Sequence, residues 1–178
     1  MPSYEVYHSH PLTPSQRQAL ATSITNLHCA AFTTPSFFVH VQFISHDASD
    51  GTYFMAGKAR LANSNHIKGH VRTSAARSRA DFDDLGAKIE SAWYDVLRVP
   101  GGPEPADDET KRLLKMSFHP MIAIREGGMA IPEAGKEGEW FKRQMPFFEE
   151  MAERKGNQDF VDLLRELAER EDLKRLLQ

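Results

Sequence analysis

The order of the periodic segments constrains the fold of this sequence more than any other feature. Near the amino terminus, an alternating run of apolar and polar residues precedes a segment in which apolar residues recur every three or four positions. Alternation then returns. These three segments are residues 2–10, 13–32 and 36–45. Strands repeat their faces every two residues and α-helices about every 3.6, so the segments predict a strand, a helix and a strand.

The same order of segments occurs a second time. Residues 66–74 and 112–119 predict strands. Residues 78–97 between them carry a helical stripe of apolar side chains, namely Phe82, Leu85, Ile89, Trp93 and Val96. The chain therefore predicts an α/β fold made of two β-α-β units, at about residues 2–60 and 64–126. This duplication concerns the order of the elements, because few residues are identical between the two halves.

The first predicted helix has a well-marked start. Thr13 is placed to cap it, Pro14 suits the first helical position, and Gln16 can complete a capping box with Thr13. The apolar residues that follow form a single stripe, which we expect to pack on a sheet: Leu20, Ile24, Leu27 and Ala31.

The chain ends in charged, helix-forming residues after a long connection. The Pro- and Gly-rich residues 100–109 predict turns before the last strand of the second unit. Residues 1–141 then form the predicted main domain, and residues 142–178 a helical extension. Gly156 and Asn157 predict a break in that extension. The last helix carries the stripe Val161, Leu164 and Leu167.

Composition excludes several classes of protein. The 22 basic and 25 acidic residues give a formal net charge of −3, so we expect no large nucleic-acid interface. No stretch reaches the roughly 18 apolar residues of a membrane span. Cys29 is the one cysteine, so no intramolecular disulfide can form, and we expect a buried thiol in a cytoplasmic protein.

Pro2 is the first candidate for chemistry. A methionine before proline is normally removed, and the exposed proline then carries a secondary amine at the chain terminus. Such an amine starts near the ~7.7–8.0 of an ordinary α-amino group, so it can exchange protons near neutral pH. The plain alternative is a strand that happens to begin with proline, since Met-Pro starts are common.

Arginine residues form a second candidate site. Arg72 ends a predicted strand, and Arg77 and Arg79 lie at the start of the following helix. Guanidinium groups and the backbone N–H groups of a helix start can together bind a carboxylate. The alternative is a solvated turn in which the arginines pair with Asp81, Asp83 and Asp84.

Two strings carry a resemblance to a known family. Residues 124–141, "IREGGMAIPEAGKEGEWF", and residues 12–28, "LTPSQRQALATSITNLH", resemble segments of cis-3-chloroacrylic acid dehalogenase and its relatives in the tautomerase superfamily. The resemblance covers roughly residues 2–141. It implies one sheet built by two fused β-α-β units, with helices on one face, in a homotrimer that needs no cofactor.

The resemblance also implies roles for particular residues. Pro2 falls on the catalytic proline of the family, and Glu126, directly before two glycines, on a glutamate that activates water. His28 falls on a substrate-binding histidine, and Arg72 on the first of two carboxylate-binding arginines. Arg77 takes the second.

The second arginine is less secure, because this chain holds two extra residues between the two positions, and Arg79 is the rival. His28 and Glu126 have ordinary alternatives as well, as a histidine near a helix end and a charged residue before a turn. His8, His10 and His40 are expected to be polar strand residues, and no metal site is predicted.

One departure from the family bears on the reaction. Where the dehalogenase has a tyrosine that helps the glutamate to position water, this chain has Lys115 and Met116. The prediction is therefore an enzyme that tautomerises a small 2-oxo, enol or unsaturated carboxylate. Water addition or dehalogenation, with Lys115 or Tyr4 in place of the tyrosine, is one alternative. A trimeric binding module that retains Met1 is the other.

Overall fold

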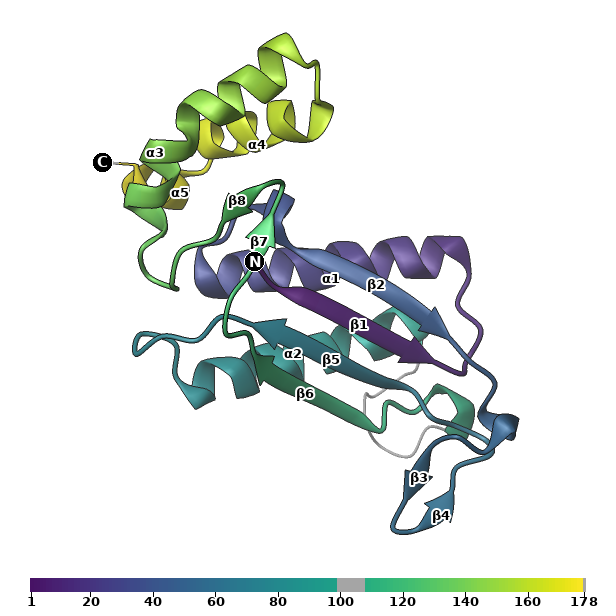
Figure 1. Cartoon of the computed structure of the whole chain (residues 1–178). Helices are drawn as coiled ribbons and strands as arrows, with labels where there is room; N and C mark the ends of the chain where they lie inside the picture. Colours follow the sequence, from purple (N-terminus) through teal and green to yellow (C-terminus); the bar gives the residue numbers. More distant parts are fainter. Residues whose placement is uncertain (99–107, 178) are drawn as a thin grey trace.

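The computed structural model describes residues 1–98 and 108–177, so most of the turn predicted at 100–109 lies outside the described residues. The main sheet has four strands in the order β2-β1-β5-β6 (Figure 1). They are β1 (Ser3–His8), β2 (His40–Ser45), β5 (His66–Val71) and β6 (Lys115–Pro120). The predicted α/β fold of two β-α-β units in one sheet is confirmed.

Strand directions place the start of β1, the first strand of one unit, beside the end of β5, the first strand of the other. β1 is parallel to β2 and β5 is parallel to β6, as expected within β-α-β units. The two units meet through β1 and β5, which are antiparallel, with Ser3 opposite His70. Pro2, which precedes β1, therefore lies close to Val71, the last residue of β5, and to Arg72, which follows it.

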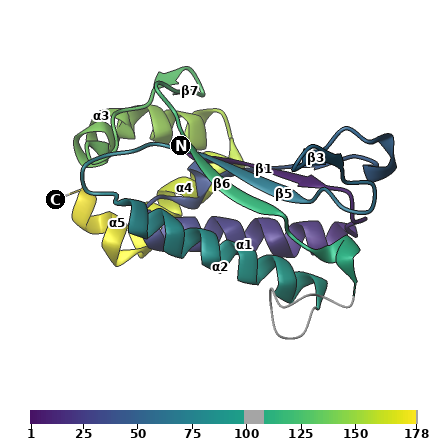
Figure 2. The ribbon, with the colours of Figure 1, turned by 90° about the horizontal axis from the view of Figure 1, so that it is seen from below.

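Both long helices, α1 (Pro14–Phe32) and α2 (Arg79–Leu97), cover the same face of the sheet, as Figure 2 shows. Each begins with a capping box. Thr13 and Gln16 form that of α1, as predicted, and Ser78 and Asp81 form that of α2. The helices bury one face because their apolar residues recur at helical spacing.

The stripe of α1 differs from the predicted one at its end. Leu20 and Ile24 are buried, but Ala31 is exposed and His28 takes the buried position instead. His28 can be buried because the Tyr4 hydroxyl provides a hydrogen-bonding partner for its ring. The apolar stripe therefore ends in a polar residue near the start of β1.

The core between sheet and helices contains side chains from both units. Its largest buried members are Tyr4, Leu20, Ile24, Ile67, Leu85, Ile89 and Trp93. Gly69 on β5 has no side chain because a Cβ there would lie 2.8 Å from the Phe118 ring and 3.0 Å from the Tyr4 ring. The glycine thus lets two aromatic rings pack over the sheet and holds Tyr4 beneath the start of the strand.

Several short elements connect the main ones. A 3₁₀ turn, η1 (Ser36–Phe38), replaces the start of the strand predicted at 36–45. The remaining ones are η2 (Ala48–Asp50), the hairpin β3 (Phe54–Met55) and β4 (Lys58–Ala59), η3 (Glu109–Lys111), and the hairpin β7 (Arg125–Glu126) and β8 (Met129–Ala130).

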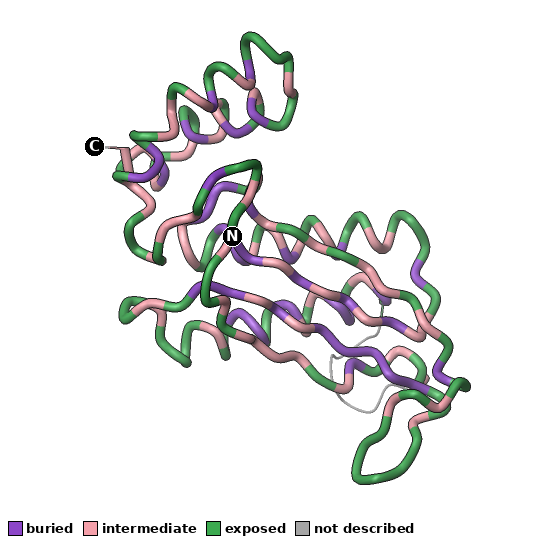
Figure 3. Tube along the Cα trace, in the orientation of Figure 1, coloured by how far each residue is buried: buried purple, intermediate pink, exposed green. Residues whose placement is uncertain are grey.

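The C-terminal helices pack near the start of β1, at the end of the sheet where the amino terminus lies (Figure 1). They are α3 (Glu137–Glu149), a π-helical turn η4 (Glu150–Arg154), α4 (Gln158–Glu169) and α5 (Glu171–Leu176). Their apolar residues enclose Met1, Phe38 and Met129 in a second cluster. Figure 3 marks buried positions along these helices, apart from those of the main sheet. The boundary predicted at residue 141 falls within α3.

The predicted break between the C-terminal helices is present. The predicted apolar stripe of α4 is wrong, because a neighbouring set of residues is buried instead. Gly156 adopts a positive φ of 61°, and the Asn157 side chain caps α4. The buried residues are Phe160, Leu163 and Leu167, while Val161 and Leu164 are half-buried. The aromatic ring of Phe160 determines the register, because it packs among the rings of other phenylalanines.

No helix among the described residues has both the length and the apolar character needed to cross a membrane.

Candidate active site

Pro2 lies where the two units of the sheet meet. It is buried, and its carbonyl oxygen accepts a hydrogen bond of 3.1 Å from the backbone N–H of His40 on β2. With Met1 present, the Pro2 nitrogen is part of a peptide bond and has no basic lone pair. The terminal amino group is then that of Met1, whose side chain is 3 % exposed and packs in the second cluster.

The amino group of Met1 reports on the electrostatics at this end of the sheet. Its pKa is lowered from 8.0 to about 5, and burial is the largest cause of that shift. The positive charges of Arg72 and Arg77 contribute to this lowering, whereas the negative charges of Glu126 and Glu137 oppose it. Four charged side chains from separate parts of the chain therefore act electrostatically on the chain terminus.

The two arginines share one carboxylate. Arg72 Nη2 donates to Glu137 Oε1 at 2.7 Å, and Arg77 Nη2 lies 3.3 Å from the same oxygen. Arg72 Nη1 also donates to the carbonyl of Pro132 at 2.6 Å. The side chains of both arginines and of Glu137 are only 8–13 % exposed. Arg72 and Arg77 thus form a pair that already binds a carboxylate.

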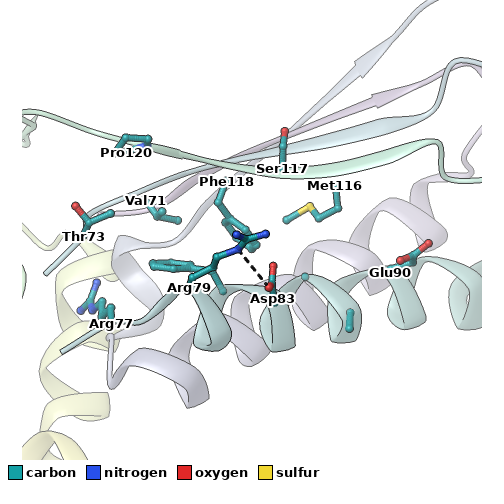
Figure 4. A pocket seen from close by; sticks show the side chains of 13 residues that line it. Val71, Thr73, Arg77, Arg79, Asp83, Glu90, Met116, Ser117, Phe118 and Pro120 are labelled. Carbon is teal, nitrogen blue, oxygen red and sulfur yellow. Dashed lines mark ion pairs between the residues drawn. The ribbon is translucent and has the colours of Figure 1, made fainter. Parts of the chain in front are cut away.

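Arg79, the rival for the second arginine, lies elsewhere. Its side chain is 94 % exposed and forms an ion pair of 3.7 Å with Asp83 along α2. Arg79 and Asp83 line a groove of about 810 Å³ between α2 and β6. Figure 4 shows Arg79 turned toward Asp83, with Arg77 set apart from both. Arg79 therefore forms the ion pair with aspartate that was the alternative expected for these arginines. Arg77 instead contacts the same glutamate as Arg72.

His28 points toward the same end from α1. Its Nδ1 lies 2.8 Å from the Tyr4 hydroxyl, and both groups are buried. Burial, with help from Arg77, the chain terminus and Arg72, lowers the pKa of His28 to about 3. The imidazole is therefore neutral over the physiological range, and it can bind a ligand by a hydrogen bond while adding no charge.

Glu126 reaches the site from a tight hairpin. It ends β7, and Gly127 and Gly128 form the two-residue turn with φ of 56° and 83°. Two successive residues with positive φ are typical of a type I′ turn, which explains the Gly-Gly pair. Glu126 Oε1 lies 2.9 Å from Nε2 of His40, and this hydrogen bond raises the pKa of His40 against the opposing effect of burial.

Neither residue suggested in place of the missing tyrosine acts on Glu126. Lys115 begins β6 opposite His66, at the other end of the sheet from Arg72, so that suggestion is wrong. Tyr4 directs its hydroxyl to His28. His40 is the residue that contacts the glutamate, a role that the sequence interpretation missed. Its only signal was a polar residue at the start of a strand.

Glu137 was also missed, although it lies within the string that carried the resemblance. Glu137 lies in the first turn of α3, where an acidic residue is favourable because of the helix dipole. The sequence therefore gives no separate signal for its contact with two distant arginines. Among the residues that the structure describes, no cluster of His, Cys, Asp and Glu side chains could hold a metal ion.

A sheet of two fused β-α-β units, with a proline at the start of its first strand and paired arginines beside it, defines a protein of the tautomerase class. Residues 1–145 match the family described as "Putative oxalocrotonate tautomerase enzyme", and the chain belongs to this family. No curated protein matches the chain.

Solved structures agree with this assignment. N1, a member of the cis-3-chloroacrylic acid dehalogenase (cis-CaaD) family, is 29% identical with a TM-score of 0.57, over 79% of this chain and 90% of that one. The fused 4-OT asymmetric trimer F6 is 16% identical over 72% and 94%, with a TM-score of 0.53. Leishmania major MIF2 is 14% identical over 74% and 97%, also with a TM-score of 0.53. The last two similarities concern the fold.

Proposed function

We propose that this protein is a cofactor-independent tautomerase acting on a small 2-oxo or enol carboxylate, with the terminal amine of Pro2 as its proton-transfer group. The observation that carries the proposal is the setting of the chain terminus, which is buried among Arg72, Arg77, Glu126 and Glu137 and whose amine has a lowered pKa. Removal of Met1 would put the secondary amine of Pro2 close to that position.

The proposed reaction conserves protons. Arg72 and Arg77 bind the substrate carboxylate, and His28 donates a hydrogen bond to the distant oxygen. The neutral amine of Pro2 accepts the proton of the enol hydroxyl, and the resulting ammonium delivers a proton to carbon 3, which yields the 2-oxo acid. A base of this kind must be unprotonated at neutral pH, which burial and two nearby guanidinium groups favour.

Water addition is the second candidate, and the contact between His40 and Glu126 favours it. In that reaction Glu126 would take a proton from water, the oxygen would attack carbon 3 of an unsaturated carboxylate, and a protonated Pro2 would deliver a proton to carbon 2. A 3-haloacrylate would then lose halide. The two candidates need opposite protonation states of Pro2, and the lowered pKa at the terminus supports the base role and tautomerisation.

Assembly as a homotrimer is part of the proposal. The fused 4-OT structures similar in fold are trimers by their titles. The helices of this chain cover one face of the sheet, and the other face carries Glu5, Tyr7, Lys68, His70 and His119, which contact one another and are available to a neighbouring subunit. We also propose a cytoplasmic location, in keeping with Cys29 as a free and buried cysteine.

The test compares native protein with a Pro2→Ala variant in the ketonisation of phenylenolpyruvate, followed by ultraviolet absorbance. General acid-base groups contribute about 10²- to 10⁴-fold, so we expect kcat/KM to fall by about a hundredfold or more. Ser3→Ala, one residue further along the strand, serves as the control. Full activity of the Pro2→Ala protein would refute the assignment.

The water-addition candidate and the binding module have their own readouts. Halide release from 3-haloacrylates that is lost in Glu126→Gln would establish water addition in place of tautomerisation. The mass of the intact native protein shows whether Met1 is removed. A retained Met1 would leave an amide at Pro2 and favour the binding module.

A further inference from the structure

The carboxylate between the two arginines belongs to the protein itself. Glu137 Oε1 contacts Arg72 and Arg77, while Glu137 Oε2 accepts a hydrogen bond of 2.6 Å from the backbone N–H of Gly135. Both oxygens are therefore held, and the side chain is 13 % exposed. Any substrate carboxylate that binds this pair of arginines must share them with Glu137 or displace it.

Sharing is feasible because a guanidinium group has five N–H donors. Arg72 uses donors on Nη1 for Pro132 and on Nη2 for Glu137, and Arg77 Nη1 lies 3.4 Å from the carbonyl of Arg72. Each terminal nitrogen carries two N–H groups. The number of donors therefore allows a second carboxylate to bind the same arginines without breaking the first contacts.

The balance of charges at the site limits the class of ligand that can supply this second carboxylate. The four ionised side chains that act on the chain terminus are two arginines and two glutamates, so their charges sum to zero. A monocarboxylate adds one negative charge, and each arginine can still offset it. A dicarboxylate adds a second negative charge in a largely buried site that already contains two carboxylates.

We propose that Glu137 is a specificity-determining residue, a resident carboxylate that makes the arginine pair select monocarboxylates over dicarboxylates. The inference rests on the proposed function for the identity of the substrate site, and it deepens that function by naming the substrate class. Coulomb interactions between charges several ångströms apart near a protein surface correspond to a roughly ten- to hundredfold preference.

A binding experiment tests this without turnover. Isothermal titration calorimetry of the native full-length protein with 2,4-hexadienoate and 2,4-hexadienedioate compares two ligands that share one carbon skeleton and differ in a second carboxylate. We expect the native protein to bind the monocarboxylate at least tenfold more tightly. In Glu137→Gln the preference should fall by at least tenfold, and in Glu137→Asp, which keeps the charge, it should persist.

Glu139→Gln is the matched control, because Glu139 lies in the same turn of α3, carries the same charge and is exposed. An unchanged preference in Glu137→Gln, or an equal change in Glu139→Gln, would overturn the proposal. So would native protein that binds the dicarboxylate as tightly as the monocarboxylate, or that binds neither ligand, and this result needs no variant to fold. Loss of turnover in Pro2→Ala with the same binding preference would separate this proposal from the proposed reaction.

Discussion

The two ends of the sheet are built alike and differ in their chemistry. At one end β1 begins beside the end of β5, and at the other end β5 begins beside the end of β1. Each helix that covers the sheet has 19 residues and a capping box at its start. The first end contains the chain terminus and paired arginines, whereas the second is closed by neutral hydrogen bonds.

Asn65 closes the second end. Its side-chain oxygen accepts from the backbone N–H groups of Ser9 at 2.9 Å and His10 at 3.0 Å, and its amide nitrogen donates to the carbonyls of Thr110 and Arg112. All of these contacts join neutral groups, and Asn65 is fully buried. Asn65 thus provides hydrogen-bonding partners for backbone groups of two loops at the second end. At the first end, by contrast, charged groups act on an amine.

The helices show the same contrast at equivalent positions. His28 lies fourteen residues after Pro14, the first residue of α1, and Trp93 lies fourteen residues after Arg79, the first residue of α2. Trp93 donates its Nε1–H to the carbonyl of Lys111 at 2.7 Å and belongs to the core. The two β-α-β units therefore place equivalent helix positions at the two ends of the sheet. The residue type at each position determines whether that end contributes to the core or to the candidate active site.

The largest effect is expected from removing the charge at the first end. Arg72→Met deletes the donor that the proposed substrate and Glu137 share, so kcat/KM for ketonisation of phenylenolpyruvate should fall about a hundredfold or more, as for loss of a principal anion-binding donor. Arg79→Met is the control and should keep native activity. Equal losses in both variants would break the distinction between the two arginines.

At the second end, the matching variant should affect stability and leave activity unchanged. Asn65→Ala removes five side-chain hydrogen bonds and leaves partly buried backbone groups of Ser9, His10, Thr110 and Arg112 without these partners, so we expect the free energy of unfolding to fall by about 2 kcal/mol or more. Urea denaturation measures this loss. A large drop in kcat/KM of the folded variant would contradict a purely structural second end.

A smaller effect concerns the contact between His40 and Glu126. Because the hydrogen bond to Glu126 raises the pKa of His40 above its ordinary 6.5, the charged pair should stabilise the fold below that value and lose its contribution as the pH rises through the raised pKa. Glu126→Gln should bring the pKa of His40 back down, as measured by NMR titration of the imidazole. An unchanged titration would show that the contact is absent in solution.

The sequence predicts the repeated frame well because its signals are local. Alternation, helical spacing and the Thr13 capping box all depend on residues close together in the chain. The site is harder, because Glu137 meets Arg72 across 65 positions and His40 meets Glu126 across 86. The choice between Arg77 and Arg79 likewise depends on which side chain turns toward a distant helix, which no local pattern records.

The C-terminal helices illustrate the same limit. Their helical character and the break at Gly156 follow from composition, but the burial of Phe160 depends on Phe37, Phe147 and Phe148. An apolar residue one position away fits the helical pattern equally well. The sequence pattern of α4 therefore does not determine which of its residues are buried.

The central claim is that the chain terminus is a free proline amine with a lowered pKa beside the paired arginines. A ¹⁵N NMR titration of the terminal nitrogen in native protein tests it most directly. The account predicts a titrating secondary amine whose pKa lies clearly below the ~7.7–8.0 of an ordinary α-amino group. An amide nitrogen that does not titrate, or an amine with a pKa of 8 or above, would contradict it.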